Sequence, residues 1–130
     1  MSTLRTNALE GVDAKNSITI VAGAGNITTT NVQEGLCKAW NMVNQSGGTP
    51  AFADSFNCSS LEDEATGRTF NNLTNNMNSA NFATSGKTVA TNFSCVEVYK
   101  TTGVRYRAFN SSFSETDLDS NTLAINGDLA

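Results

Sequence analysis

Histidine is absent from this chain of 130 residues, and only 15% of its residues are charged. Without histidine, a serine triad of the usual kind cannot form. General acid–base catalysis needs paired groups in a shared pocket, whereas the carboxylates here gather in segments that we expect to be exposed loops. We therefore expect a protein that is not an enzyme and that has no catalytic residues.

Long apolar runs and an excess of positive charge are also lacking. No run approaches the roughly 18 apolar residues that a membrane-spanning helix needs, so we expect no membrane insertion. The net charge is −4, whereas proteins that bind nucleic-acid phosphates are usually basic, so we expect no nucleic-acid partner. The first five residues, Met-Ser-Thr-Leu-Arg, have no apolar signal-peptide core, which predicts synthesis in the cytoplasm without Sec secretion.

Cysteine is scarce, and the spacing of the three cysteines suggests no disulfide or metal-binding pair. Cys37, Cys58 and Cys95 are far apart in the sequence, and no two of them form a C-x-x-C motif. We expect reduced, buried thiols that act as small apolar side chains, and the alternative is one disulfide with a spare thiol. A zinc site would need four ligands, which these cysteines supply only with added carboxylates, so we expect no metal or cofactor.

The chain is rich instead in asparagine, serine and threonine, arranged in short alternating segments. Turn pairs separate the segments at Thr66-Gly67, Thr102-Gly103 and Asn126-Gly127. This pattern is typical of strands joined by hairpins. It predicts an all-β fold with a β-sandwich or jelly-roll-like body over residues 36–130. Residues 1–35 have too few apolar side chains to form a core, so we expect an extended N-terminal arm.

The body has recognisable strand candidates at residues 52–61, 68–74, 82–89, 93–99, 104–109 and 122–125. In the arm, residues 17–21 are β-prone. One or two helical turns are expected from Asn31, as the N-cap, into a strand near Lys38. The large apolar side chains of the body are the expected core anchors: Trp40, Phe56, Phe70, Phe82, Phe93 and Val98.

Three motifs resemble ligand sites without completing them. Residues 85–88, Ser-Gly-Lys-Thr, match the end of a phosphate-binding loop, but Asn81 replaces its first glycine and a β-prone segment follows. A strand with a glycine kink or bulge is the better interpretation. Residues 23–25, Gly-Ala-Gly, lack the third glycine of a dinucleotide fingerprint and predict a turn.

The third motif is Asp117-x-Asp119-x-Asn121, which has the ligand spacing of a calcium loop. Thr122 stands where that loop requires glycine, and flanking helices are not expected. Calcium at this motif, or at residues 62–64, is the weaker hypothesis, and solvated acidic turns are the stronger one.

Several segments carry a family resemblance: residues 1–7, 29–40, 54–63 with 65–67, 75–82 and 127–130. The most specific match is Asp-Ser-Phe-Asn-Cys-Ser-Ser-Leu-Glu-Asp at 54–63, followed by Ala-Thr-Gly. In these segments the chain resembles small virion structural proteins, usually described as tail-fibre proteins, of tailed phages that infect marine bacteria, cyanobacteria in particular. The resemblance covers nearly the whole chain, and its motifs mark turns and core positions.

The resemblance implies a homotrimer in the virion, attached to other virion proteins through the N-terminal arm. Host attachment, including contact with surface glycans, is expected at polar loops: 46–50, 62–67, 101–103 and 114–120. One alternative is a trimeric capsid decoration or knob protein. Another is a free carbohydrate-binding β-sandwich module in which Trp40, Tyr99 and Tyr106 stack on sugar rings, although we expect Trp40 in the core.

Overall fold

The computed structural model describes residues 19–22, 28–31, 35–88 and 91–130. By its internal contacts the chain divides into two units, Met1–Leu36 and Cys37–Ala130. In the first unit, β1 (Thr19–Ala22) and β2 (Thr28–Asn31) pair antiparallel. The β-prone run at 17–21 is confirmed for its described part. Asn31 ends a strand, and residues 32–34 of the expected helical turns lie outside the described residues.

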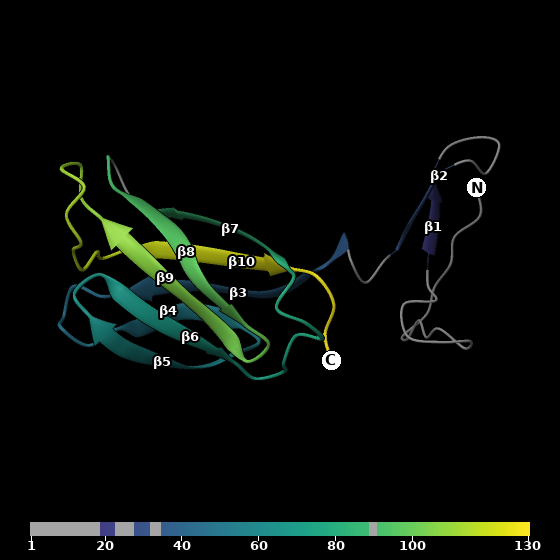
Figure 1. The fold of residues 1–130 in the computed structure, drawn as a ribbon, viewed down its shortest axis with the longest axis horizontal. Coiled ribbons are helices and arrows are strands. Elements are labelled where there is room, and N and C mark those ends of the chain that lie inside the picture. Colours follow the sequence, from purple (N-terminus) through teal and green to yellow (C-terminus); the bar gives the residue numbers. More distant parts are fainter. Residues whose placement is uncertain (1–18, 23–27, 32–34, 89–90) are drawn as a thin grey trace. The chain divides into compact units, whose positions relative to one another are not determined.

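The second unit is built from two antiparallel sheets of four strands each (Figure 1). Sheet I has the order β4-β3-β10-β7, and sheet II has the order β5-β6-β9-β8. This arrangement confirms the all-β class. The strands are β3 (Cys37–Asn44), β4 (Ala51–Phe56), β5 (Cys58–Ala65), β6 (Arg68–Leu73), β7 (Ala83–Thr88), β8 (Phe93–Lys100), β9 (Gly103–Phe109) and β10 (Asn121–Asn126).

The predicted single strand at 52–61 is wrong, because the chain changes sheets at Asn57. This residue has a φ of 56°, in the left-handed region that asparagine tolerates better than most residues. Its side chain fixes the junction: Nδ2 donates to the carbonyl of Lys38 (2.9 Å), and Oδ1 accepts from the backbone of Asn75 (2.8 Å). The chain therefore leaves sheet I after β4 and enters sheet II one residue later.

The predicted turn at 62–67 is shorter than expected, because β5 continues to Ala65. Only Thr66 and Gly67 form the hairpin loop, and Gly67 has a φ of 70°. Glycine adopts this positive φ without steric cost. The acidic residues at 62–64 thus belong to a strand and not to a solvated turn.

One apolar core is formed by inward side chains of both sheets. Sheet I contributes Ala39, Leu123 and Ile125, and sheet II contributes Leu73 and Val104. The C-terminal tail and the loops add to this cluster with Met77, Phe82 and Leu129. Phe82 is therefore confirmed as a core contact.

A buried polar network extends this interior around Gln45. Its Nε2 donates to Thr69 Oγ1 (2.7 Å), and its Oε1 accepts from Asn121 Nδ2 (2.7 Å). The Gln45 backbone N–H donates to the carbonyl of Leu118 (2.8 Å). Buried polar side chains are tolerated when they pair in this way, and the network attaches the segment before β10 to both sheets.

Two of the predicted core anchors are wrong: Trp40 is 39% exposed and Phe56 is 53% exposed. The strand expected near Lys38 forms as β3, but Trp40 lies on its outer face and not in the core. Ala39 and Val43 are fully buried and face inward, so Trp40 between them faces outward. Phe56 is directly opposite Trp40 in the β3–β4 pairing and shares its outer face.

Phe70 is confirmed as a buried residue, whereas Phe93 and Val98 lie outside the core cluster. Phe70 is only 5% exposed, yet it lies on the outer face of sheet II with the Lys100 ammonium 5.1 Å from its ring centre. Phe93 is half-buried and stacks on Phe109, with 4.9 Å between ring centroids. Val98 is half-buried opposite Arg105, next to an irregularity in the pairing of β8.

The three cysteines are free thiols, but their predicted burial is wrong for two of them. Cys37 and Cys95 are exposed, and Cys95 pairs with Arg107 on the outer face of sheet II. Cys58 is half-buried and packs against the apolar core. Its burial raises the pKa of its thiol, although the amides of Asn71 and Asn41 oppose this rise.

Candidate functional site

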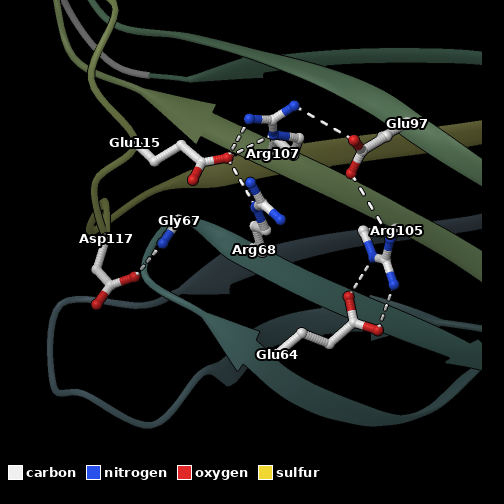
Figure 2. Close-up of polar contacts among 8 residues, drawn as sticks. All are labelled: Glu64, Gly67, Arg68, Glu97, Arg105, Arg107, Glu115 and Asp117. Carbon is white, nitrogen blue, oxygen red and sulfur yellow. Dashed lines mark hydrogen bonds and ion pairs between the residues drawn. The ribbon is translucent and has the colours of Figure 1, made fainter.

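The outer face of sheet II carries a continuous chain of ion pairs (Figure 2). Glu115 accepts from both Arg68 and Arg107, and Glu97 lies between Arg107 (3.2 Å) and Arg105 (3.7 Å). Arg105 also binds Glu64 with two nitrogens. The members come from all four strands of sheet II and from the segment between β9 and β10. Three arginines and three glutamates balance one another within the network.

The ion pairs stabilise the charged forms of four side chains: Glu64, Arg68, Arg105 and Glu115. The hydrogen bond from Arg105 lowers the pKa of the Glu64 carboxyl, and the one from Arg68 lowers that of Glu115. The same bonds raise the pKa of the Arg105 and Arg68 guanidinium groups. These side chains are therefore ionised and mutually paired at neutral pH, which suits a structural role better than proton transfer.

The network also holds the segment that was predicted to be an exposed acidic loop at 114–120. Asp117 Oδ1 accepts from the Gly67 backbone N–H (2.7 Å), and the Thr116 N–H donates to Ala108 (3.1 Å). Leu118, next in the sequence, is buried. Much of this loop is thus attached to sheet II. Among the described residues, no group of three or more potential metal ligands lies together.

The outer face of sheet I is different, because large and small side chains are separated on it. The strand register places four residues in one row across the sheet, Phe56–Trp40–Ala124–Ser85. The adjacent row on the same face is Asp54–Met42–Thr122–Lys87. Residues directly opposite on neighbouring strands share a face. The β4–β3 half therefore forms a ridge, and the β10–β7 half is low.

A groove of about 490 Å³ follows the low half of this face, along β10. Its lining includes Trp40 and Met42 on β3, Thr122 and Ala124 on β10, and Lys87 on β7. The Thr122 hydroxyl bonds the Lys87 carbonyl (2.9 Å) and N–H (3.1 Å), so the polar group of the floor is already paired. The groove thus offers an apolar wall, a floor of small side chains and one cation.

The motif at 85–88 lies in strand β7, as predicted, but the pairing of β7 with β10 is regular and Gly86 forms no bulge. A Cβ on Gly86 would come within 2.5 Å of the Thr122 carbonyl, so only glycine allows β7 to approach β10 this closely.

A smaller cavity of about 130 Å³ lies near β7 and β8, and its lining includes Val96, Tyr106 and Leu123. Ligand pockets usually measure about 300–1,000 Å³, so this cavity is small for a sugar. Tyr106 is buried, which raises the pKa of its phenol. Tyr99 is exposed but hydrogen-bonds Thr84 (3.0 Å). Of the three predicted stacking residues, Trp40 alone lines the groove on sheet I.

No family model, no curated protein and no solved structure matches this chain. Within the described part of the chain, no helix has the length and hydropathy to cross a membrane. The surfaces described above are therefore interpreted from their own chemistry.

Sequence reasoning missed most of the residues on both outer faces. Arg105 and Arg107 stand out in the sequence as two cations two residues apart. Nothing in the sequence points to their partners, Glu64, Glu97 and Glu115. Asp54, Met42 and Lys87 gave no local signal, because only the pairing of β4, β3, β10 and β7 brings them into one row.

Proposed function

We propose that this chain is a non-enzymatic structural protein of a bacteriophage virion, of the tail-fibre type, and that it works as a homotrimer. The observation that carries the proposal is the exposed ridge of Trp40, Met42 and Phe56 on a small β body. Large exposed apolar side chains that cluster on one face mark a contact surface. The sequence resemblance, which extends nearly end to end, supports a virion as the place of that contact.

The body of this protein is proposed to be a β-sandwich of the jelly-roll-like kind. Eight strands in two four-stranded sheets, with one core between them, support this architecture. The N-terminal unit is proposed to attach the trimer to other virion proteins, and the body to contribute to host attachment.

Purified particles of the phage that encodes the chain provide the test. Mass spectrometry should find the protein in intact particles, and cryo-electron microscopy should locate trimeric density on the tail. Density on the capsid surface would favour the decoration or knob alternative. Absence from intact particles would contradict both.

A free carbohydrate-binding module is the second candidate, because Trp40 lies exposed beside the groove along β10. Aromatic rings bind the apolar faces of sugars, and neighbouring polar groups bind the hydroxyls. Trp40 is the sole tryptophan, so its fluorescence reports directly on this surface. A saturable fluorescence change with an oligosaccharide, lost in Trp40→Ala, would favour the module.

A further inference from the structure

We propose that three copies of this chain associate through the outer face of sheet I, around a threefold axis parallel to its strands. The ridge on β4 and β3 of one copy packs into the groove along β10 and β7 of the next. The inference rests on the proposed homotrimer and deepens it, because it assigns the surface that the copies share.

The first argument is the separation of large and small side chains across the face. In one row, Phe56 and Trp40 stand on the ridge, and Ala124 and Ser85 lie in the low half. In the next row, Met42 stands opposite Thr122. A single copy cannot fill its own groove with these side chains, since register fixes them to the other half of the sheet. A neighbouring copy can fill it.

The second argument is charge. Asp54 and Lys87 occupy the same row at opposite edges of sheet I, on β4 and β7. Within the described residues, neither side chain belongs to an ion pair within 4.0 Å. The Asp54 carboxylate accepts from the Ser55 N–H, its neighbour in the chain. When the ridge of one copy meets the groove of the next, Asp54 of the first faces Lys87 of the second.

The third argument concerns symmetry. A rotation about an axis parallel to the strands keeps each row at its own height, so Asp54 stays level with Lys87. Each copy uses its ridge toward one neighbour and its groove toward the other, and such head-to-tail contacts close into a ring at three copies when the rotation is 120°. Equivalent strands of the three copies then point the same way, so the three chains enter their bodies at Cys37 from one end.

The area of the face sets how much this contact contributes. Four strands spaced about 4.8 Å apart, with six residues rising about 3.3 Å each, cover a plane of about 400 Å². A standard interface buries about 800 Å² on each partner. Each copy divides this face between two neighbours, about 200 Å² for each contact, so the face of sheet I is only part of the interface that a stable trimer needs. Sheet II is the less suitable surface, because Arg68, Arg105 and Arg107 on it already pair with glutamates of the same copy.

Charge reversal in the full chain tests the pairing. Light scattering at micromolar concentration should give a trimer for the natural sequence and a monomer for Asp54→Lys and Lys87→Asp, since each variant places like charges opposite each other at all three contacts. The double variant Asp54→Lys/Lys87→Asp should restore the trimer. Asp119→Lys, an exposed carboxylate elsewhere, is the matched control and should remain trimeric.

A zero-length carbodiimide cross-link tests the same pair in the unaltered protein, without depending on whether a variant folds. In trimers assembled from a mixture of ¹⁴N- and ¹⁵N-labelled chains, a cross-link between copies joins an Asp54 peptide of one label to a Lys87 peptide of the other. We expect this mixed-label peptide. Absence of that mixed peptide, or single variants that stay trimeric, would overturn the inference while leaving the homotrimer in place. A monomer for the natural sequence would overturn both. Two monomeric single variants without rescue in the double variant would overturn the Asp54–Lys87 contact and the inference with it.

Discussion

The two outer faces of this small β body follow opposite rules. On sheet II, long charged side chains pair with one another, and Phe70 is buried with the Lys100 ammonium over its ring. On sheet I, Trp40, Met42 and Phe56 stay exposed beside two charged residues, Asp54 and Lys87, that belong to no ion pair of the described chain. Both sheets contribute to one core, so folding by itself does not require this difference. A face that neutralises itself needs no partner, whereas a face with an apolar ridge favours one.

The largest expected effect is on stability, at Phe70, a buried residue of β6 in sheet II. Phe70→Ala should lower the free energy of unfolding by about 3 kcal/mol, because a buried ring is lost and a cavity remains. Urea unfolding followed by circular dichroism measures the loss. Phe113→Ala is the control: this ring is 78% exposed, and its removal should change stability by about 0.5 kcal/mol or less. Equal losses in both variants would contradict the burial of Phe70.

The stability of the β5–β6 hairpin in sheet II also depends on the turn at Gly67. A Cβ there would come within 2.7 Å of the Ala108 carbonyl and of the Thr116 nitrogen. Gly67→Ala should therefore cost about 2 kcal/mol or more, from backbone strain and from the steric clash. Gly48 has a similar φ, 73°, with open space around it, so Gly48→Ala should cost only the strain, about 1 kcal/mol. Thermal melting compares the two, and equal melting temperatures would count against the clash.

The ion pairs of sheet II predict a pH dependence of stability. The pKa of Glu64 and that of Glu115 are lower in the folded chain than their ordinary value of 4.5. Their contribution is thus complete above that value and is lost as the pH falls through the lower folded pKa. The melting temperature should drop on acidification below about pH 4.5. Glu115→Gln should flatten this dependence, whereas Asp119→Asn should leave its slope unchanged.

The smallest effect is expected from thiol labelling, which separates the two faces directly. A bulky maleimide on Cys95 should leave the oligomeric state unchanged, because this thiol lies on the outer face of sheet II. The same label on Met42→Cys, in a background with the natural cysteines replaced by serine, should reduce association by blocking the ridge of sheet I. Light scattering measures the oligomeric state of both labelled proteins. Loss of association after Cys95 labelling would indicate that the copies associate through sheet II and not through sheet I.

Local sequence patterns were sufficient for the β class and for most strands. The run from Phe93 and the glycine turns at 67 and 103 were found where the structure has them. The phase of β3 was not predictable from hydrophobicity, because Trp40 and Met42 alternate with Ala39, Asn41 and Val43, and both sets contain apolar residues. Partners far along the chain decide it: Ala39 and Asn41 pair with Ile125 and Leu123 of β10.

The change of sheet at Asn57 and the ion pairs of sheet II were beyond local patterns for a related reason. Asparagine permits a positive φ but does not impose one. Glu64 and Arg105 are 41 residues apart, and only the pairing of β5, β6 and β9 brings them together. Residues that meet through tertiary pairing leave no trace in a short window of sequence.

Cys37 and Asn126, the first residue of β3 and the last of β10, are direct neighbours in sheet I. The first strand of the body therefore begins, and the last strand ends, at the same end of sheet I. Tension applied at Cys37 and Asn126 would break the backbone hydrogen bonds between β3 and β10 one after another. It would not shear the whole sheet at once.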